Sequence, residues 1–350
     1  MNIENLNLTR KTLLEVFEQI KDDLGLLNGK KLAILGWSGF IGSWCTALFS
    51  TAMQQGLDVE LILFSRGEKI NPNILRNLPK KNLVILQGNL SKSVPEKIRE
   101  ADHILIASTP TSGQHIHQNV EIVHKTNMAF RSFFSNPLIT GRSRPLSVVH
   151  LSSGATYKCH KETHHPYLEN DEINLESRDN YTSAKVSLEL ILKSATNLIP
   201  NLRISNPRLF TFYGPNLPLT EHFAIGNFMR DAAMGKKIII NGNPNTKRSY
   251  LHVGDLSAHI IKLLLKPYSG PINLGSDTEI SMMELATFIN DEFNGPGIKL
   301  INSNTPPSYY VPSIKKSVEI LGKANQIKFE DGIREWMQWI KNQNGKYLIN

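Results

Sequence analysis

Cysteine is scarce in this chain of 350 residues, which contains only Cys45 and Cys159. Two cysteines are too few for the disulfide framework that stabilises small secreted domains. The first residues also lack the features of a secretory signal peptide. These absences predict a protein of a reducing, cytoplasmic compartment.

Dense basic runs, internal repeats and low-complexity tracts are absent as well. The net charge of +8 and the isoelectric point near 9.3 favour an anionic partner. However, the basic residues are scattered and do not alternate with aromatic residues, which disfavours a nucleic-acid surface. We therefore expect a phosphate-bearing small molecule as the partner, and no nucleic acid.

Residues 32 to 53 form an uncharged segment that is long enough to cross a bilayer. Glycine, serine and threonine interrupt it, so we expect a strand, a turn and a buried helix there, and no membrane association. With 40% hydrophobic and 20% charged residues, the chain is predicted to form one large or two closely packed globular domains.

Strand-like and helical segments alternate along most of the chain. Residues 9 to 27 have apolar residues at helical spacing and predict an N-terminal amphipathic helix with Thr9 as its N-cap. Strands are expected at residues 32–35, 59–64, 83–86, 103–107, 146–151, 202–206 and 238–240, and helices at 41–55 and 120–134. This alternation predicts an α/β fold with a parallel sheet that is covered on both faces.

The first strand leads directly into GWSGFIGSW, in which Gly36, Gly39 and Gly42 are three residues apart. Glycine permits a tight turn and a close approach of the backbone to a pyrophosphate, and the following helix N-terminus supplies amide donors and partial positive charge. The order of strand, glycines and helix predicts a dinucleotide site. The alternative is a tight strand-to-helix turn without a ligand.

The end of the second strand indicates which dinucleotide is bound. An acidic residue there binds a ribose 2′-hydroxyl, whereas a basic residue accepts a 2′-phosphate. The strand VELILF ends in Ser65, Arg66 and Gly67, with no Asp or Glu within reach. This favours NADP(H) over NAD(H), with Ser65 and Arg66 on the 2′-phosphate. The alternative is that Arg66 is a solvated loop residue.

These segments together resemble the extended short-chain dehydrogenases/reductases, the group of NAD(P)-dependent sugar-nucleotide epimerases, dehydratases and reductases, over about residues 30 to 340. The matches occur in the family's order: GWSGFIG, LQGNL (86–90), LSSGATY (151–157), YTSAK (181–185), NPRLFTFYGP (206–215), KRSYLHVGD (247–255) and INLGS (272–276). They look most like the branch of dTDP-4-dehydro-6-deoxyglucose reductases. The resemblance implies a Rossmann-type doubly wound sheet with a smaller C-terminal substrate-binding lobe.

The resemblance also implies roles for individual residues. Tyr181 would be the acid/base, Lys185 would tune it and hold the ribose, and Ser153 would orient the reacting sugar oxygen. Further implied cofactor-binding residues are Gly36, Ser38, Gly39, Phe40, Ile41, Gly42, Ser65, Arg66, Asn89, Leu90, Ala107, Ser108 and Pro207. Further implied substrate-binding residues are Thr211, Asn227 and Arg248, with Arg248 on the diphosphate.

Tyr181 and Lys185 are four residues apart, which puts both side chains on one face of a helix. Hydride transfer at a sugar carbon also requires proton transfer by a group with a pKa near neutral. Lowering a tyrosine pKa by about 3 units requires about 4 kcal/mol, and a neighbouring lysine and a cationic nicotinamide supply such stabilisation. The pair alone is common on exposed helices, but after the glycine turn and Ser153 it favours a catalytic site.

Gly154 and Ala155 follow Ser153, at the place where the family's 4,6-dehydratases have acidic residues and its decarboxylases have a glutamate. Without a carboxylate there, elimination of water lacks its usual acid and base. We therefore expect a sugar-nucleotide oxidoreductase, a 4-ketoreductase. The alternatives are a C4 or heptose-type epimerase and, in another class, a dinucleotide-binding regulator without catalysis.

No metal is expected, because the cysteine and histidines of one loop have no spacing typical of zinc. These residues are Cys159, His160, His164 and His165. We expect an N-terminal helical extension at residues 1 to 29, a dinucleotide-binding domain at 30 to 205 with 248 to 275 contributing, and a substrate-binding lobe at 206 to 247 and 276 to 350. The resemblance further implies a homodimer formed through two helices of each dinucleotide-binding domain.

Overall fold

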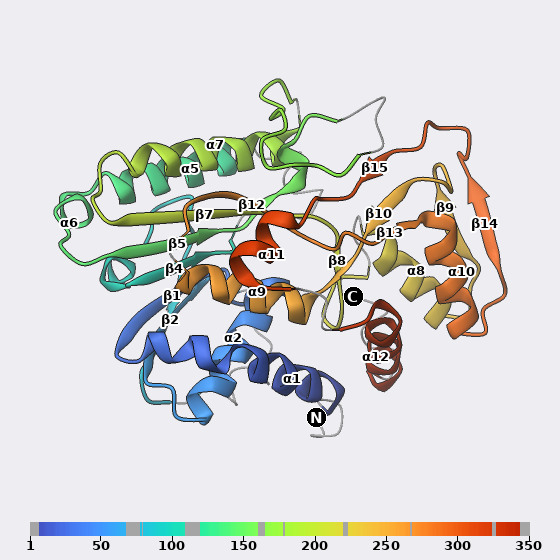
Figure 1. Ribbon diagram of the computed structural model, residues 1–350, viewed down its shortest axis with the longest axis horizontal. Helices are drawn as coiled ribbons and strands as arrows, with labels where there is room; N and C mark the ends of the chain where they lie inside the picture. Colours follow the sequence, from blue (N-terminus) through green and yellow to red (C-terminus); the bar gives the residue numbers. More distant parts are fainter. Residues whose placement is uncertain are drawn as a thin grey trace.

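A parallel β-sheet forms the centre of the computed structural model, which describes residues 7–67, 78, 80–108, 120–159, 165–177, 179–219, 223–266, 268–323 and 327–343. The strand order is β12-β7-β5-β4-β1-β2-β3, and neighbouring strands are parallel (Figure 1). The strands are β1 (Lys30–Leu35), β2 (Val59–Ser65), β3 (Leu83–Gln87), β4 (His103–Ile106), β5 (Leu146–His150), β7 (Leu202–Leu209) and β12 (Gly270–Leu274), and the short β6 (Ser152–Ser153) pairs with β7. The predicted Rossmann-type α/β fold is confirmed.

Helices cover both faces of this sheet (Figure 1). On one face lie α5 (Val120–Phe134), the short α6 (Pro137–Thr140) and α7 (Asn180–Ala195), and on the other lie α1 (Asn7–Leu24), α2 (Phe40–Gln54) and α9 (Val253–Leu265). Successive side chains of β1 point alternately toward the helices on one face of the sheet and those on the other. Leu32 and Ile34 pack with α1, α2 and α9, whereas Ala33 and Leu35 pack with α5 and α7. Burial on both faces explains why the strand is apolar throughout its second half.

The strand order reverses between β1 and β4. In open parallel sheets, ligands bind in the crevice outside the carboxyl ends of the strands at this switch point. The glycine turn follows β1, and Ala107 and Ser108 follow β4. The fold therefore places several of the predicted cofactor residues at the crevice.

A second lobe lies beside the sheet, at the right in Figure 1. Its helices are α8 (Ala224–Ala233), α10 (Met282–Glu292) and α12 (Phe329–Asn342). Its strands are β9 (Ile238–Asn241) with β14 (Ile298–Ile301), β10 (Lys247–Ser249) with β13 (Glu279–Ser281) and β15 (Tyr309–Tyr310), and β8 (Phe212–Tyr213) with β11 (Leu251–His252). An apolar cluster containing Trp336 and Trp339 fills this lobe. By contrast, α11 (Lys315–Leu321) packs against β12 and α9.

Most predicted elements occur, with one correction. The N-terminal helix is α1, followed by a 3₁₀ turn at Gly25–Leu27, but Thr9 lies inside α1, so its prediction as N-cap was wrong. Apolar residues at helical spacing identify the buried face of a helix, but they do not identify the residue at which the helix begins. The strand at 238–240 is β9, which pairs with β14 outside the central sheet. Residues 32 to 53 form β1, the turn and α2, and within the described ranges no helix is long and apolar enough to cross a membrane.

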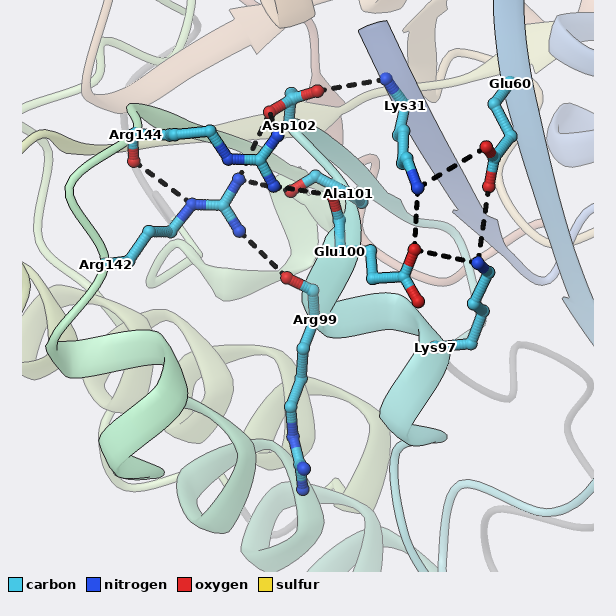
Figure 2. Close-up of polar contacts among 9 residues, drawn as sticks. All are labelled: Lys31, Glu60, Lys97, Arg99, Glu100, Ala101, Asp102, Arg142 and Arg144. Carbon is cyan, nitrogen blue, oxygen red and sulfur yellow. Dashed lines mark hydrogen bonds and ion pairs between the residues drawn. The ribbon is translucent and has the colours of Figure 1, made fainter.

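Charged side chains form a network at the N-terminal ends of β1, β2 and β4, on the edge opposite the glycine turn (Figure 2). The Nζ atom of Lys31 lies 2.6 Å from Oε2 of Glu100, and this hydrogen bond lowers the pKa of Glu100 to about 2. Asp102 accepts a hydrogen bond from the backbone amide of Lys31 at 3.0 Å and pairs with Arg142 and Arg144 at 3.3 and 3.1 Å. We interpret this network as structural, because it is remote from the switch point.

Candidate active site

The glycine turn joins β1 to α2 through a backbone path that leaves no room for side chains. Gly36 has a φ of +89°, and a Cβ atom there would lie 2.7 Å from the carbonyl oxygen of Ala107. A Cβ atom on Gly42 would lie 2.8 Å from the Cα atom of Trp37. Glycine at these positions therefore lets β1, β4 and the start of α2 come into direct contact, as close approach to a pyrophosphate requires.

The start of α2 and the end of β4 present polar groups to the crevice. Gly39 is the N-cap of α2, and no side chain caps this helix. The first amides of a helix lack intrahelical partners and carry its positive dipole end, so they suit a phosphate. Among the residues that the structure describes, the buried hydroxyl of Ser108 has no hydrogen-bond partner. The Cα atom of Ser108 lies 2.9 Å from the position of a Cβ on Gly36, so these features fit a bound dinucleotide.

Predicted cofactor residues on the outer strands lie at the same carboxyl edge. Ser65 is the last residue of β2 and is buried, whereas Arg66 is exposed. Asn89 and Leu90 follow β3. The side chain of Asn89 accepts a hydrogen bond from the amide of Ser91 at 2.9 Å. Arg66 is therefore accessible from solvent at the end of β2.

The other predicted cofactor residues are engaged in packing. Phe40 stacks on Phe212 with 5.8 Å between ring centroids, and Ile41 packs into the layer of α1, α2 and α9. Ser38 is half-buried in the turn, and Pro207 is buried in β7 beside β12. The roles of Phe40 and Ile41 in cofactor binding stay predictions.

Ser153 is held by a local hydrogen-bond pattern at the end of β6. It is the N-cap of the 3₁₀ turn Gly154–Thr156, and its hydroxyl accepts a hydrogen bond from the amide of Ala155 at 3.1 Å. Its carbonyl oxygen accepts one from the Thr156 hydroxyl at 2.8 Å. The serine hydroxyl is therefore fixed by the backbone of the residues that follow it.

Tyr181 and Lys185 lie in the first turns of α7, whose N-cap is Asp179. The hydroxyl of Ser153 lies close enough to the Tyr181 phenol to affect its pKa. The Nζ atom of Lys185 lies 5.6 Å from the centroid of the Tyr181 ring and donates to the carbonyl oxygen of Leu151 at 2.5 Å. The structure thus brings together the three predicted catalytic residues.

Burial has the largest effect on the pKa of both Lys185 and Tyr181. It lowers the pKa of Lys185 to about 7, with Glu189 acting in the opposite direction. Burial also raises the pKa of Tyr181 above its ordinary value, Asp179 adds to this, and the hydrogen bond with Ser153 opposes it. In this structure, desolvation outweighs the polar contacts of the Tyr181 phenol. The expected lowering of its pKa by Lys185 together with a cationic nicotinamide stays a prediction.

A buried ion pair that sequence reasoning missed lies one helical turn beyond Lys185. Glu189 accepts hydrogen bonds from the hydroxyl of Ser152 and from the guanidinium of Arg208, the latter at 2.8 Å. The guanidinium lies 4.7 Å from the centroid of the Tyr157 ring. This pair ties α7 to β6 and β7, and so supports the strand that carries the neighbouring serine. A glutamate four residues after a helical lysine was the available signal.

Tyr310 is a second residue that sequence reasoning missed. Its hydroxyl donates to the carbonyl oxygen of Leu209 at 3.5 Å and lies 2.5 Å from the position that a Cβ on Gly154 would occupy. Its ring lies 4.5 Å, between centroids, from that of Phe210. A Tyr-Tyr pair in a loop-rich lobe matches no motif, so no local signal pointed to it.

The sequence pattern of the NAD dependent epimerase/dehydratase family matches residues 32–275, which include the glycine turn, Ser153, Tyr181 and Lys185. The chain belongs to this family. A curated relative, UDP-glucuronic acid decarboxylase 2 of Arabidopsis thaliana, is 24% identical over 338 residues, which cover 93% of this chain and 72% of the relative.

Solved structures share the fold of this family member. An epimerase from the methanogen Methanothermobacter thermautotrophicus has a TM-score of 0.76 and 20% sequence identity. The match covers 95% of this chain and 98% of the epimerase chain. The UDP-N-acetylglucosamine 4-epimerase of Methanobrevibacter ruminantium, in complex with UDP-N-acetylmuramic acid, has a TM-score of 0.73 and 20% sequence identity. The match covers 90% of this chain and 99% of that epimerase chain. The similarity extends through both lobes.

Arg248, the predicted diphosphate residue of this epimerase/dehydratase family member, lies on β10. Its Nη2 atom donates to the hydroxyl of Ser308 at 2.9 Å. Its guanidinium lies 5.6 Å from the centroid of the Tyr310 ring, and burial lowers its pKa. Tyr310 thus lies between the arginine of the second lobe and Gly154.

The other two predicted substrate residues take part in contacts of the second lobe. Thr211 follows β7, and its carbonyl oxygen accepts a hydrogen bond from the amide of Leu251 at 3.1 Å. Asn227 lies on α8, where its side-chain oxygen accepts a hydrogen bond from Arg230 at 3.1 Å. Their roles in substrate binding stay predictions.

The loop that contains Cys159 and the three neighbouring histidines lies only partly within the described residues. Cys159 is exposed, and His165 is exposed with a local contact to the carbonyl oxygen of Pro166 at 3.3 Å. His160 and His164 lie outside the described residues. Among the residues that the structure describes, no group of three or more His, Cys, Asp or Glu could hold a metal ion.

Proposed function

We propose that this protein is an NAD(P)-dependent sugar-nucleotide oxidoreductase that transfers hydride at a sugar carbon, C4, as a 4-ketoreductase. One observation carries the proposal: Ser153, Tyr181 and Lys185 converge at the carboxyl edge of the sheet, and Gly154 and Ala155 provide no carboxylate there. Such a site is equipped for hydride and hydroxyl-proton transfer. It lacks, at these two positions, the acid and base that elimination needs.

Each of these residues has a defined task in the reduction. The bound nicotinamide cofactor supplies the hydride. Tyr181 donates a proton to the carbonyl oxygen of the keto sugar as the carbon is reduced, and its raised pKa keeps the phenol protonated for this purpose. Ser153 hydrogen-bonds the same oxygen and fixes its position. Lys185 holds the cofactor ribose and stabilises the phenolate that the transfer leaves behind.

A C4 epimerase is the second candidate, because the same residues also remove a hydroxyl proton when hydride leaves the sugar. The solved structures described above favour it, since both are named epimerases. The curated relative is a decarboxylase. We disfavour decarboxylation here because residues 154 and 155 carry no carboxylate.

The cofactor of the family is NAD, and the finer choice of NADP(H) is our proposal. Support comes from the exposed Arg66 directly after β2 and from the lack of an acidic residue at the strand end. For the substrate, we propose a nucleoside diphosphate sugar whose diphosphate pairs with Arg248. When the substrate binds, the guanidinium of Arg248 would donate to phosphate oxygens in place of the hydroxyl of Ser308.

We further propose a homodimer formed through α5 and α7. The outer surface of these helices exposes Met128 and Leu190, at 46% and 54% of their full exposure. His124, Arg131 and Ser187 border the same shallow depression. Exposed apolar side chains on two adjacent helices favour burial against a second copy.

The decisive experiment incubates the purified protein with NADPH or NADH and a panel of sugar nucleotides and their 4-keto derivatives. Cofactor oxidation with a 4-keto sugar supports the reductase, and interconversion without net oxidation supports the epimerase. Tyr181→Phe is expected to lower turnover by at least about a hundredfold. Tyr309→Phe is the control and is expected to have the turnover of the wild type. Unchanged turnover in Tyr181→Phe would overturn the catalytic proposal.

A further inference from the structure

Two buried side chains of α7 hold the segment that carries Ser153. Lys185 and Glu189 are four residues apart and lie on one face of the helix. The Nζ atom of Lys185 donates a hydrogen bond to the carbonyl oxygen of Leu151 at 2.5 Å. The carboxylate of Glu189 accepts a hydrogen bond from the hydroxyl of Ser152. Both residues that directly precede Ser153 are therefore attached to α7.

The carboxylate of Glu189 is itself fixed by Arg208. The Nε atom of Arg208 donates to Oε1 at 3.2 Å, and its Nη2 atom donates to Oε2 at 2.8 Å. Such a bidentate pair restricts the carboxylate to one orientation. Ser152 and Arg208 are in register on β6 and β7, and Ser152, Glu189 and Arg208 are 2%, 9% and 2% exposed. The oxygen that accepts from Ser152 therefore has a fixed position.

Glu189 differs from Lys185 in having no task in the proposed reaction. Lys185 is the residue proposed to hold the cofactor ribose, so its donors serve the ligand as well as the Leu151 carbonyl. All the hydrogen bonds that Glu189 accepts come from Ser152 and Arg208 in the described part of the chain. The contact between Glu189 and Ser152 can therefore persist whether or not a cofactor is bound.

We propose that Glu189 is a positioning residue that fixes Ser153 relative to Tyr181. It acts through Ser152, and Arg208 holds its carboxylate in place. This inference rests on the proposed function and adds a residue that supports its site. Ser152 and Ser153 are the two residues of β6, so a shift of the first moves the second. A small misplacement of a group that orients the reacting atom lowers the rate of the chemical step.

The first test is Ser152→Ala, which removes one hydroxyl and leaves the ion pair intact. With the sugar nucleotide that the wild type converts best, kcat is expected to fall about three- to tenfold, as for loss of one hydrogen bond. KM and the dissociation constant of NADPH should stay within about twofold, because the glycine turn and Arg248, proposed to bind the ligands, lie on other elements. The matched control is Ser147→Ala. Ser147 is a buried serine of β5 whose hydroxyl donates to the carbonyl oxygen of Leu264 at 2.9 Å, and its loss should leave kcat unchanged.

The second test compares two double variants, because removing Glu189 alone would leave the charge of Arg208 buried without its partner. Glu189→Gln with Arg208→Met removes both charges and keeps a side-chain oxygen for Ser152. Glu189→Leu with Arg208→Met removes both charges and that oxygen. The first double variant is expected to keep a kcat about three- to tenfold above that of the second.

A further readout needs no turnover. The amide of Ala155 donates to the Ser153 hydroxyl, and the amide of Tyr157 donates to the carbonyl oxygen of Gly154. If Glu189 holds this segment through Ser152, the amide hydrogens of residues 151 to 157 should exchange with solvent faster in Ser152→Ala than in the wild type. Ser147→Ala should leave their exchange unchanged.

The outcomes separate this inference from the proposed function. If the wild type is active and Ser152→Ala keeps its kcat, the inference fails and the function stands. If no sugar nucleotide is converted, the function fails, and faster exchange in Ser152→Ala alone would still support the positioning of Ser153. Effects of equal size in Ser147→Ala would overturn the inference, because they would then reflect a general loss of stability. Equal kcat values in the two double variants would overturn it as well.

Discussion

The hydroxyl of Tyr310 lies 2.5 Å from the point where a Cβ atom on Gly154 would stand. A side chain at residue 154 would therefore collide with the phenol of the second lobe. A Cβ there would also lie 2.8 Å from the ring of Phe210. The residue at which this chain departs from the dehydratase pattern is thus glycine because a tyrosine and a phenylalanine occupy its side-chain space.

Gly154→Ala is expected to destabilise the protein by about 1–3 kcal/mol, because both rings must move to admit one methyl group. In a double-mutant cycle with Tyr310→Phe, the two changes should couple by at least about 0.5 kcal/mol, since they share one contact. Urea denaturation measures both values. Gly25→Ala is the control, because nothing lies within 4 Å of a Cβ at that position. Additive effects would contradict the contact.

Lys185→Met is expected to abolish turnover and yet to stabilise the fold. Burial lowers the pKa of Lys185 from 10.5 to about 7. Between these values the unfolded chain holds a proton that the folded chain releases, so wild-type stability rises with pH. The gain from removing this lysine should be about 2 kcal/mol at pH 7 and should disappear as the pH approaches 10.5.

The measurement for this lysine is the free energy of unfolding as a function of pH. Lys193→Met, an exposed position on the same helix, is the control and should change stability by less than about 0.5 kcal/mol. A Lys185→Met protein that is less stable than wild type at every pH would show that burial of the amine is not costly.

Local patterns were enough to predict the elements of the site. The glycine spacing after an apolar strand and the four-residue spacing of Tyr181 and Lys185 each depend on a few neighbouring residues, and backbone geometry converts them directly into a turn and a helix face. The alternation of strands and helices likewise predicted the parallel sheet. These features need no knowledge of distant contacts.

Features that depend on tertiary contacts could not be predicted. Tyr310 reaches Gly154 only because β15 pairs with β10 in the second lobe, and no short-range pattern encodes that pairing. The burial that raises the pKa of Tyr181 is likewise a property of the assembled site. The Glu189 and Arg208 pair likewise joins residues of separate elements.

Arg142→Met is expected to lower stability by about 3 kcal/mol, because it removes one partner of a buried ion pair. Arg142 donates to the carbonyl oxygens of Arg99 and Ala101 at 2.9 and 2.8 Å and pairs with Asp102 (Figure 2). The control is Arg144→Met, which contacts the same carboxylate from a side chain that is 56% exposed. Loss of the Arg144 side chain should lower the free energy of unfolding by less than about 1 kcal/mol.

Thermal or urea unfolding separates these two arginines, and turnover per folded molecule should be unchanged in both. Equal losses of stability would show that the burial of Arg142 has no energetic consequence. A fall in turnover of the folded protein would instead connect this edge of the sheet to catalysis.

Arg66→Ala is expected to weaken binding of NADPH about tenfold or more while leaving binding of NADH within about twofold, because only NADPH carries the 2′-phosphate. Titration of each cofactor, followed by its fluorescence, measures both dissociation constants. The control is Arg144→Ala, since Arg144 is an exposed arginine at the opposite edge of the sheet. Equal losses for the two cofactors would remove Arg66 from the 2′-phosphate, and tighter wild-type binding of NADH than NADPH would overturn the preference itself.

Leu190→Glu is expected to convert a dimer into monomers, because it places a charge at the centre of the proposed α5 and α7 interface. Leu190 is 54% exposed in the single chain and lies beside Met128 and Ile191. A carboxylate buried between two copies without a partner costs several kcal/mol, which is enough to shift a micromolar dimer to monomers. Light scattering after gel filtration measures the mass. Leu26→Glu, at a leucine beyond α1 that is 62% exposed, should keep the dimer. A wild type that elutes as a monomer at all concentrations would disprove the interface.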